Sequence, residues 1–174
     1  MSDKENNFKE KFKQALISTS KVISDDYILG LKKNVNKDAN PKYNKFFEID
    51  KLANKSDFIR FRAKADSAAL EKKFSNKDIY NKNLPINQSC KSLYKIAEKV
   101  RYELLGCQML KGIKKNLNED YYQKIDVKKK DPLKTKDDVH VTGAFELYML
   151  KKFFNLKLNS SSSKMVSFWE KYLE

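Results

Sequence analysis

Histidine and cysteine, two residue types that often carry catalysis, are few in this sequence. The one histidine, His140, follows Asp137 and Asp138. A single histidine with no second histidine or cysteine cluster is a poor zinc signal, so we expect it at the surface, in the first turn of a helix. The four glycines are far apart, and no Gly-rich loop that could hold the phosphates of ATP or of a dinucleotide is present. We therefore predict no catalytic, cofactor-binding or metal-binding residues in this chain.

The two cysteines, Cys90 and Cys107, fall in one predicted helix. Because a helix rises about 1.5 Å per residue, they are about 25 Å apart, which is too far for a disulfide. We expect both to be buried thiols that pack as small apolar residues in a reduced compartment. A hydrolase or metal enzyme built on Cys107 or His140 is an alternative hypothesis, which alanine substitutions of both residues would test.

Two helical segments carry polar residues and glycines in unusual positions. Asp66 stands in the middle of an apolar stripe, and an unpaired buried carboxylate is very costly. We predict that Asp66 is buried and bonded to an arginine, with Arg101 as first choice and Arg62 as second. Two interpretations stay open, an internal ion pair that orders helix packing and a polar site that faces a partner. The candidate structural or docking residues are Arg62, Asp66, Ser67, Arg101, Glu103, Gly106, Gly112 and Asn116.

The two glycines of the second segment also suggest close packing. A glycine inside a helix costs about 1 kcal/mol relative to alanine. Such a residue usually reflects a close neighbour or a break in the helix. We expect Gly106 to admit the helix that carries Asp66, and Gly112 to mark a second contact or the end of the helix.

Hydrophobic periodicity indicates that helices position these residues. The predicted fold is a single, mainly α domain over residues 1–174, with about five helices and a small β-hairpin near residues 27–49. Residues 76–88 are predicted as a loop, residues 116–136 as a mixed segment and residues 160–163 as a loop ending in an N-cap. The predicted helices cover residues 8–23, 56–74, 89–116 and 137–154, followed by one short helix near the C-terminus.

The net charge of +14 admits a nucleic-acid partner as a second function. Only three of the 37 basic residues are arginines, however, and the lysines are spread along almost the whole chain. Because arginine is the preferred residue for bidentate phosphate and base contacts, a solvated surface is the favoured interpretation. The sequence shows no apolar run long enough to span a membrane and no secretory signal, so we expect a cytoplasmic protein.

Four segments, taken in order, resemble the N-terminal region of CobT, a subunit of the aerobic, ATP-dependent cobaltochelatase of cobalamin biosynthesis. They are the opening residues 12–16, the Ala-Asp-Ser-x-Ala-Leu stretch at residues 65–70, the segment from Arg101 to Leu117, and the closing residues 165–169. The family has glycine where this chain has Ala63. It also has histidines where this chain has residues 74–80, so any metal-related role of those histidines is not expected here.

The resemblance implies a three-component machine that inserts cobalt into the corrin ring, and so forms cobalt–nitrogen coordination bonds. An AAA+ subunit of that machine hydrolyses ATP, a large subunit holds the corrin, and CobT couples the two. The machine as a whole uses ATP, magnesium and cobalt, and no cofactor is expected in this chain. In the family an acidic linker and a von Willebrand-type domain follow this region, so we expect the chain to be a fragment of a longer protein. Its implied role is non-catalytic docking, and a homo-oligomer stays open.

Overall fold

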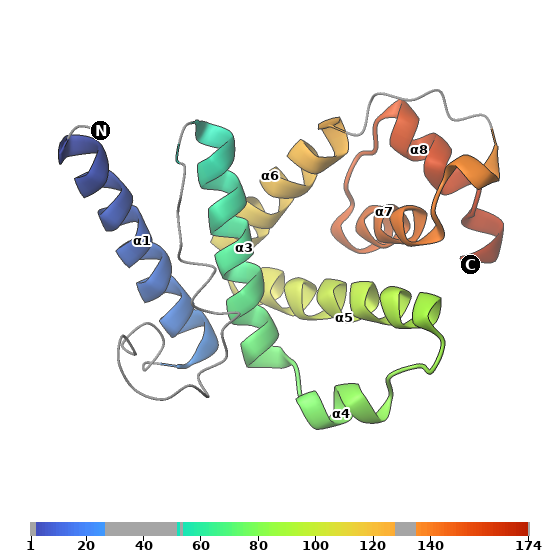
Figure 1. The fold of residues 1–174 in the computed structure, drawn as a ribbon, viewed down its shortest axis with the longest axis horizontal. Coiled ribbons are helices and arrows are strands. Elements are labelled where there is room, and N and C mark those ends of the chain that lie inside the picture. Colours follow the sequence, from blue (N-terminus) through green and yellow to red (C-terminus); the bar gives the residue numbers. More distant parts are fainter. Residues whose placement is uncertain (1–2, 27–51, 53, 128–134, 174) are drawn as a thin grey trace. The chain divides into compact units, whose positions relative to one another are not determined.

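The computed structural model describes residues 3–26, 52, 54–127 and 135–173. The fold is mainly helical, and these residues form seven α-helices and no strand, where about five helices were predicted (Figure 1). The predicted hairpin near residues 27–49 lies outside the described residues. The chain divides into two compact units, Met1–Phe74 and Ser75–Glu174. The prediction of a single domain stays a prediction, and each unit is described by itself.

The first unit consists of two packed helices, α1 (Asp3–Ser24) and α3 (Lys55–Phe74). Both were predicted, although α1 begins at Asp3, before the predicted start at residue 8. A core of Leu16 and Ala65 lies between them, edged by Phe12, Ile17 and Phe61. Aromatic side chains extend the contact between the two helices. The ring of Phe58 on α3 packs edge to face on those of Phe8 and Phe12 on α1, at centroid distances of 5.5 and 4.9 Å. Burial of these apolar side chains accounts for the pairing of the helices.

The C-terminal ends of α1 and α3 are joined by ion pairs. Asp25 has a left-handed backbone (φ 55°), which ends α1 as predicted. Asp25 and Asp26 then pair with Lys73 and Lys72 of α3. The turn after α1 is thereby held against the last turn of α3.

The second unit is built around α5 (Gln88–Met109), which packs against α6 (Lys111–Val127) and α7 (Val141–Phe154). The short α8 (Ser160–Ser167) packs on α7. Two 3₁₀ turns, Lys136–Asp138 and Glu170–Tyr172, precede α7 and follow α8. The buried apolar residues of the unit are Val100, Tyr102, Ile113, Leu117, Tyr121, Ile125, Val139, Ala144, Leu147, Tyr148, Leu150, Phe154, Leu156 and Val166.

The helix predicted over residues 89–116 is correct as far as Met109, but it does not continue unbroken to residue 116. Leu110 has an extended backbone (φ −137°, ψ 117°), which ends α5, and a new helix begins at Lys111. The predicted mixed segment is therefore helical as far as Val127. Because α6 folds back onto α5, the apolar stripe of α6 can be buried against its own neighbour in sequence.

Three further predictions are corrected at helix starts. The predicted loop over residues 76–88 contains the helix α4 (Lys77–Lys82). The helix predicted from residue 137 begins at Val141, after a 3₁₀ turn. The serines at residues 160–163 lie within α8, and the side chain of Asn159 caps that helix instead. In each case a polar side chain satisfies free amide groups of the first turn, so no apolar pattern marks the start.

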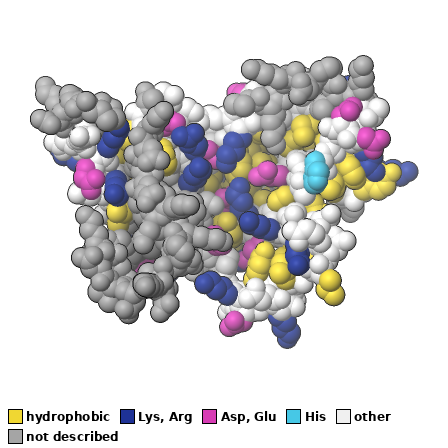
Figure 2. Space-filling model, in the orientation of Figure 1, with side chains coloured by type: hydrophobic (Ala, Val, Ile, Leu, Met, Phe, Trp, Pro, Cys, Tyr) yellow, Lys and Arg dark blue, Asp and Glu magenta, His cyan; other side chains and the backbone are white. Residues whose placement is uncertain are grey.

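Lysine and arginine side chains occur over much of the visible surface, interspersed with acidic and apolar ones (Figure 2). Within the described residues, no helix combines the length and the apolar character that crossing a bilayer requires.

Candidate functional site

The second unit buries a carboxylate between two helices. Glu103 of α5 and Tyr121 of α6 have only 1% and 2% of their surfaces exposed. The phenol of Tyr121 donates a hydrogen bond to Oε2 of Glu103. Because burying a charge is costly unless it is hydrogen-bonded, this contact favours one register of α6 on α5. Glu103, a predicted candidate, therefore joins the two helices.

Two lysines lie against the ring of Tyr121. The Nζ atoms of Lys99 and Lys124 are 5.0 and 5.3 Å from the ring centroid, within the range of cation–π attraction. Lys99 also pairs with Glu146 of α7 at 3.5 Å, and Lys124 pairs with Asp120 at 2.5 Å. The charges around the phenol are thus matched by opposite charges on α6 and α7.

The environment of Tyr121 suits a structural role better than proton transfer. Burial raises the pKa of the Tyr121 phenol far above its ordinary value, and the nearby charge and hydrogen bond of Glu103 raise it further. A general acid works best when its pKa lies near the operating pH. The phenol stays protonated near neutral pH and serves as a permanent hydrogen-bond donor.

Tyr121 lies in the part of the sequence that was predicted as a mixed segment, residues 116–136. Its place in α6 could have been found from Ile113, Leu117, Tyr121 and Ile125, which recur every four residues and are all buried. The pairing with Glu103 has no comparable signal in the sequence, because the two residues come from different helices.

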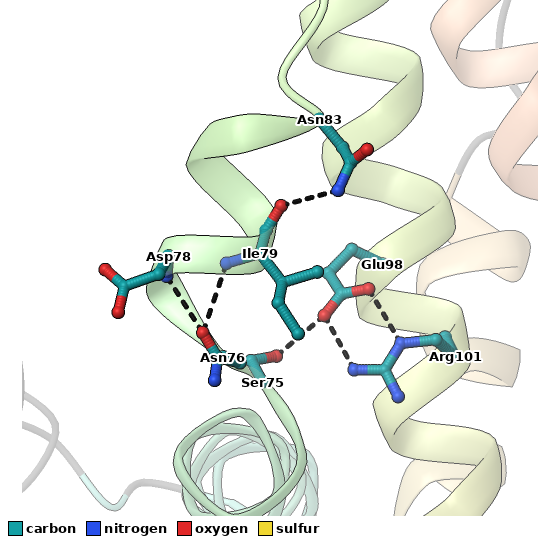
Figure 3. A network of polar contacts seen from close by, with 7 residues as sticks. All are labelled: Ser75, Asn76, Asp78, Ile79, Asn83, Glu98 and Arg101. Atoms are coloured by element: carbon teal, nitrogen blue, oxygen red, sulfur yellow. Dashed lines mark hydrogen bonds and ion pairs between the residues drawn. The ribbon is translucent and has the colours of Figure 1, made fainter.

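Arg101, another candidate, is held by its own helix. Its Nε and Nη2 atoms each donate a 2.7 Å hydrogen bond to Glu98 (Figure 3). Ser75 Oγ donates a third bond of 2.9 Å to Glu98. The hydrogen bond from Arg101, followed by the one from Ser75, holds the pKa of Glu98 below its usual value, and Glu98 in turn raises the pKa of Arg101. This contact ties the segment before α4 to α5.

The same region shows how α4 starts and ends. Asn76 Oδ1 accepts hydrogen bonds from the backbone amides of Asp78 and Ile79 at 2.9 and 3.1 Å (Figure 3). At the other end, Asn83 Nδ2 donates to the carbonyl of Ile79 at 2.8 Å. The network in Figure 3 is therefore a structural junction between α4 and α5.

The candidates of the first unit lie on α3. Asp66 is buried, as predicted, while Arg62 is exposed and Ser67 is half-buried. The burial of Asp66 is thus confirmed. Its pairing with Arg101 or Arg62 stays a prediction.

The connection between α5 and α6 exposes apolar side chains. We call residues 109–115 the α5–α6 corner. Met109 and Leu110 are 41% and 43% exposed, although both are large and apolar. The carbonyl of Leu110 accepts hydrogen bonds from the amides of Ile113 and Lys114 at 3.1 and 3.4 Å, which starts α6 at this position.

The three remaining candidates lie near this corner. Gly106 is buried in α5, and its predicted close approach to the helix of Asp66 stays a prediction. Asn116 is half-buried on α6. Gly112 is exposed, and no heavy atom of the described residues lies within 4 Å of the position that a Cβ would occupy. Gly112 is the second residue of α6, so it lies in the first turn of that helix and not within the long helix that was predicted.

The residues considered for catalysis are dispersed. His140 is exposed and is the N-cap of α7, where its Nδ1 lies 2.7 Å from Thr142 Oγ1. Both cysteines lie on α5, but Cys90 is exposed and Cys107 is half-buried, so the prediction of two buried thiols is wrong. Among the described residues, no three His, Cys, Asp or Glu side chains are grouped as metal ligands.

A cluster of aromatic and basic residues closes the C-terminal end of the second unit. Lys136 Nζ lies 4.1 Å from the ring centroid of Trp169 and 3.8 Å from that of Tyr172. The indole Nε1 of Trp169 donates a 3.0 Å hydrogen bond to the carbonyl of Val139. The turn before α7 is thereby joined to the turn after α8.

Comparison with known protein families places nearly the whole chain in one of them. The family model described as cobalamin biosynthesis protein CobT matches residues 6–174, nearly the whole chain. No curated protein and no solved structure matches this chain.

Proposed function

We propose, since the chain belongs to the CobT family of cobalamin biosynthesis proteins, that it is a non-catalytic docking domain of a cobaltochelatase subunit. In this proposal the chain helps to insert cobalt into the corrin ring during cobalamin biosynthesis. Its partners are an AAA+ ATPase subunit and a large corrin-binding subunit. ATP, magnesium and cobalt are handled by the assembled complex, with cobalt as its substrate.

The observation that carries this proposal is the environment of Gly112. Its φ lies outside the left-handed region, so its backbone does not require glycine. No described neighbour requires it either, because a Cβ would meet no heavy atom within 4 Å. A glycine in an exposed helical position costs up to about 1 kcal/mol relative to alanine. A partner whose backbone approaches α6 closely would account for the missing side chain.

The apolar residues beside Gly112 support the same surface. Met109 and Leu110 precede it directly and are exposed. Apolar residues that are buried only in a complex are common at the centres of protein interfaces. The α5–α6 corner is therefore the docking surface that we assign to the AAA+ subunit.

Substitution of Gly112 tests the proposal by separating folding from binding. Gly112→Ala should leave the free energy of unfolding unchanged or raise it by up to about 1 kcal/mol, as helix propensity implies. Gly112→Leu should also fold, because the space beside the glycine is open. We expect Gly112→Leu to weaken binding of the purified AAA+ subunit at least about tenfold, since overpacking an interface of this kind costs about 1–3 kcal/mol.

Ser163→Leu is the matched control, because it places the same side chain at an exposed position on α8. Isothermal titration calorimetry would give the affinities, and chemical denaturation would give the stabilities. If Gly112→Leu and Ser163→Leu bind the AAA+ subunit as tightly as the unmodified chain, the corner is not the docking surface. If the unmodified chain binds neither chelatase subunit, the docking function is wrong.

A further inference from the structure

Three lysines gather on one face of α6 at the α5–α6 corner. Lys111, Lys114 and Lys115 are all exposed, and the first turn of α6 contains no acidic residue. Residues three and four apart lie above one another on a helix, so Lys111 is a neighbour of both other lysines. None of the three forms an ion pair within the part of the chain that the structure describes. Their mutual repulsion is thus not offset by described carboxylates.

The lysine face points away from the core of the second unit. The buried stripe of α6 begins with Ile113 and Leu117. At about 100° of rotation per residue, Lys111 and Lys115 each lie about 160° from Ile113 around the helix axis. Lys111 and Lys115 are therefore displayed to solvent on the side opposite the contact with α5. Lys114, about 100° from Ile113, is exposed at the edge of this face.

The same corner presents an apolar centre beside these charges. Leu110 starts α6, and Lys114 lies one helical turn beyond it, with its amide bonded to the Leu110 carbonyl at 3.4 Å. Met109 adds a second exposed apolar side chain. An apolar centre with a polar, solvent-accessible rim is the usual arrangement of a protein interface. Here the described rim carries positive charge.

The chemistry of the corner favours a polypeptide over a nucleic acid. Recognition of single-stranded nucleic acid relies on aromatic rings that stack on bases, and phosphate recognition favours the fork of arginine. Residues 109–115 contain neither an arginine nor an aromatic residue. Lysines around aliphatic side chains instead suit carboxylates placed around an apolar anchor.

We propose that the α5–α6 corner binds an acidic segment of a partner protein. An apolar side chain of that segment packs on Met109 and Leu110, and its carboxylates pair with Lys111, Lys114 and Lys115. This inference rests on the proposed docking surface and adds the chemical character of its partner.

A synthetic peptide tests this inference without any chelatase subunit. The probe is a fluorescently labelled helical peptide of glutamates with leucine at intervals of three and four residues, titrated with the full chain and followed by anisotropy. We expect saturable binding that weakens as salt is added, because salt screens exposed charges. Reversal of all three charges, Lys111→Glu, Lys114→Glu and Lys115→Glu, should weaken peptide binding at least about tenfold.

The control changes the net charge equally at exposed positions outside the corner: Lys82→Glu, Lys95→Glu and Lys157→Glu. This variant should bind the peptide within about threefold of the unmodified chain, because its charges lie outside the contact. No binding by the unmodified chain, or equal weakening in both variants, would overturn the inference. So would tighter binding of a single-stranded oligonucleotide of matched charge that is lost with the same three lysines. If the peptide binds as expected but the AAA+ subunit does not, the proposed function fails and the acidic specificity stands.

Discussion

Removal of the Tyr121 hydroxyl should destabilise the second unit with little change in packing. Tyr121→Phe keeps the ring, which meets Phe154 edge to face at a centroid distance of 5.7 Å. It removes the hydrogen bond that the phenol donates to the buried carboxylate of Glu103. Hydrogen bonds to charged groups contribute about 1.5–3 kcal/mol. We therefore expect the free energy of unfolding of this unit to fall by about 2 kcal/mol near neutral pH, measured by urea denaturation.

The effect should depend on pH in a definite direction. The pKa of Tyr121 is raised in the folded state, so the unfolded chain releases this proton more readily. The stabilisation is therefore complete below the unfolded pKa of about 10 and is lost as pH rises above that value. Since one pKa unit corresponds to about 1.4 kcal/mol, the advantage of the unmodified chain over Tyr121→Phe should shrink by about that amount per pH unit above pH 10.

The neighbouring Tyr122 offers a matched control. It is 40% exposed, so Tyr122→Phe should change the free energy of unfolding by less than about 0.5 kcal/mol. If Tyr121→Phe is as stable as Tyr122→Phe, the bond to Glu103 contributes nothing measurable. A difference between the unmodified chain and Tyr121→Phe that stays constant above pH 10 would contradict the argument from the raised pKa.

Two further substitutions test packing. Asp66→Ala should lower the free energy of unfolding by about 3–5 kcal/mol if Asp66 is half of a buried ion pair. Asp78→Ala, at an exposed position, should lower it by less than about 1 kcal/mol. Equal melting temperatures of the two variants would contradict the predicted pairing of Asp66. Gly143→Ala should raise the free energy of unfolding by about 0.5–1 kcal/mol, because alanine is the better helix former. The added Cβ has room, since it would lie at an ordinary contact distance of 3.6 Å from Met165 Cε. A lower midpoint of denaturation would show that this contact cannot adjust.

The helices with a regular apolar stripe were predictable from the sequence. In the apolar stripe of α3 that contains Asp66, the central residues Ala63, Asp66 and Leu70 are buried, while Ile59 and Phe74 at its ends are half-buried. The helix covers residues 55–74 where 56–74 was predicted. The burial of Asp66 followed from the same pattern, because a residue in phase with the stripe faces the same side of the helix whatever its polarity. Hydrophobic period is thus a reliable guide to which face of a helix is buried.

The break at Leu110 could not be found in this way. The stripe of α5 includes Leu104 and Cys107, and Leu110 continues it in phase. Only the extended backbone of Leu110 separates the two helices. The spacing of apolar residues continues across this change in chain direction. The sequence pattern therefore predicted one helix as far as residue 116.

Contacts between helices were the least predictable part of the candidate site. Glu103 was a candidate, but its bond to Tyr121 depends on how α6 folds back onto α5. Arg101 forms two hydrogen bonds to Glu98, and its expected pairing with Asp66 stays a prediction. An arginine three residues after a glutamate on a helix is a local contact that sequence spacing could have indicated.

The chain has a single tryptophan, and its position determines what an optical measurement would report. Trp169 lies in the second unit, with the ammonium group of Lys136 over its ring and its indole N–H bonded to Val139. Its fluorescence therefore follows the unfolding of Ser75–Glu174 alone, whereas circular dichroism follows the helices of both units. Coincident unfolding curves would mean that the two units melt as one cooperative body, and separate curves that they melt independently.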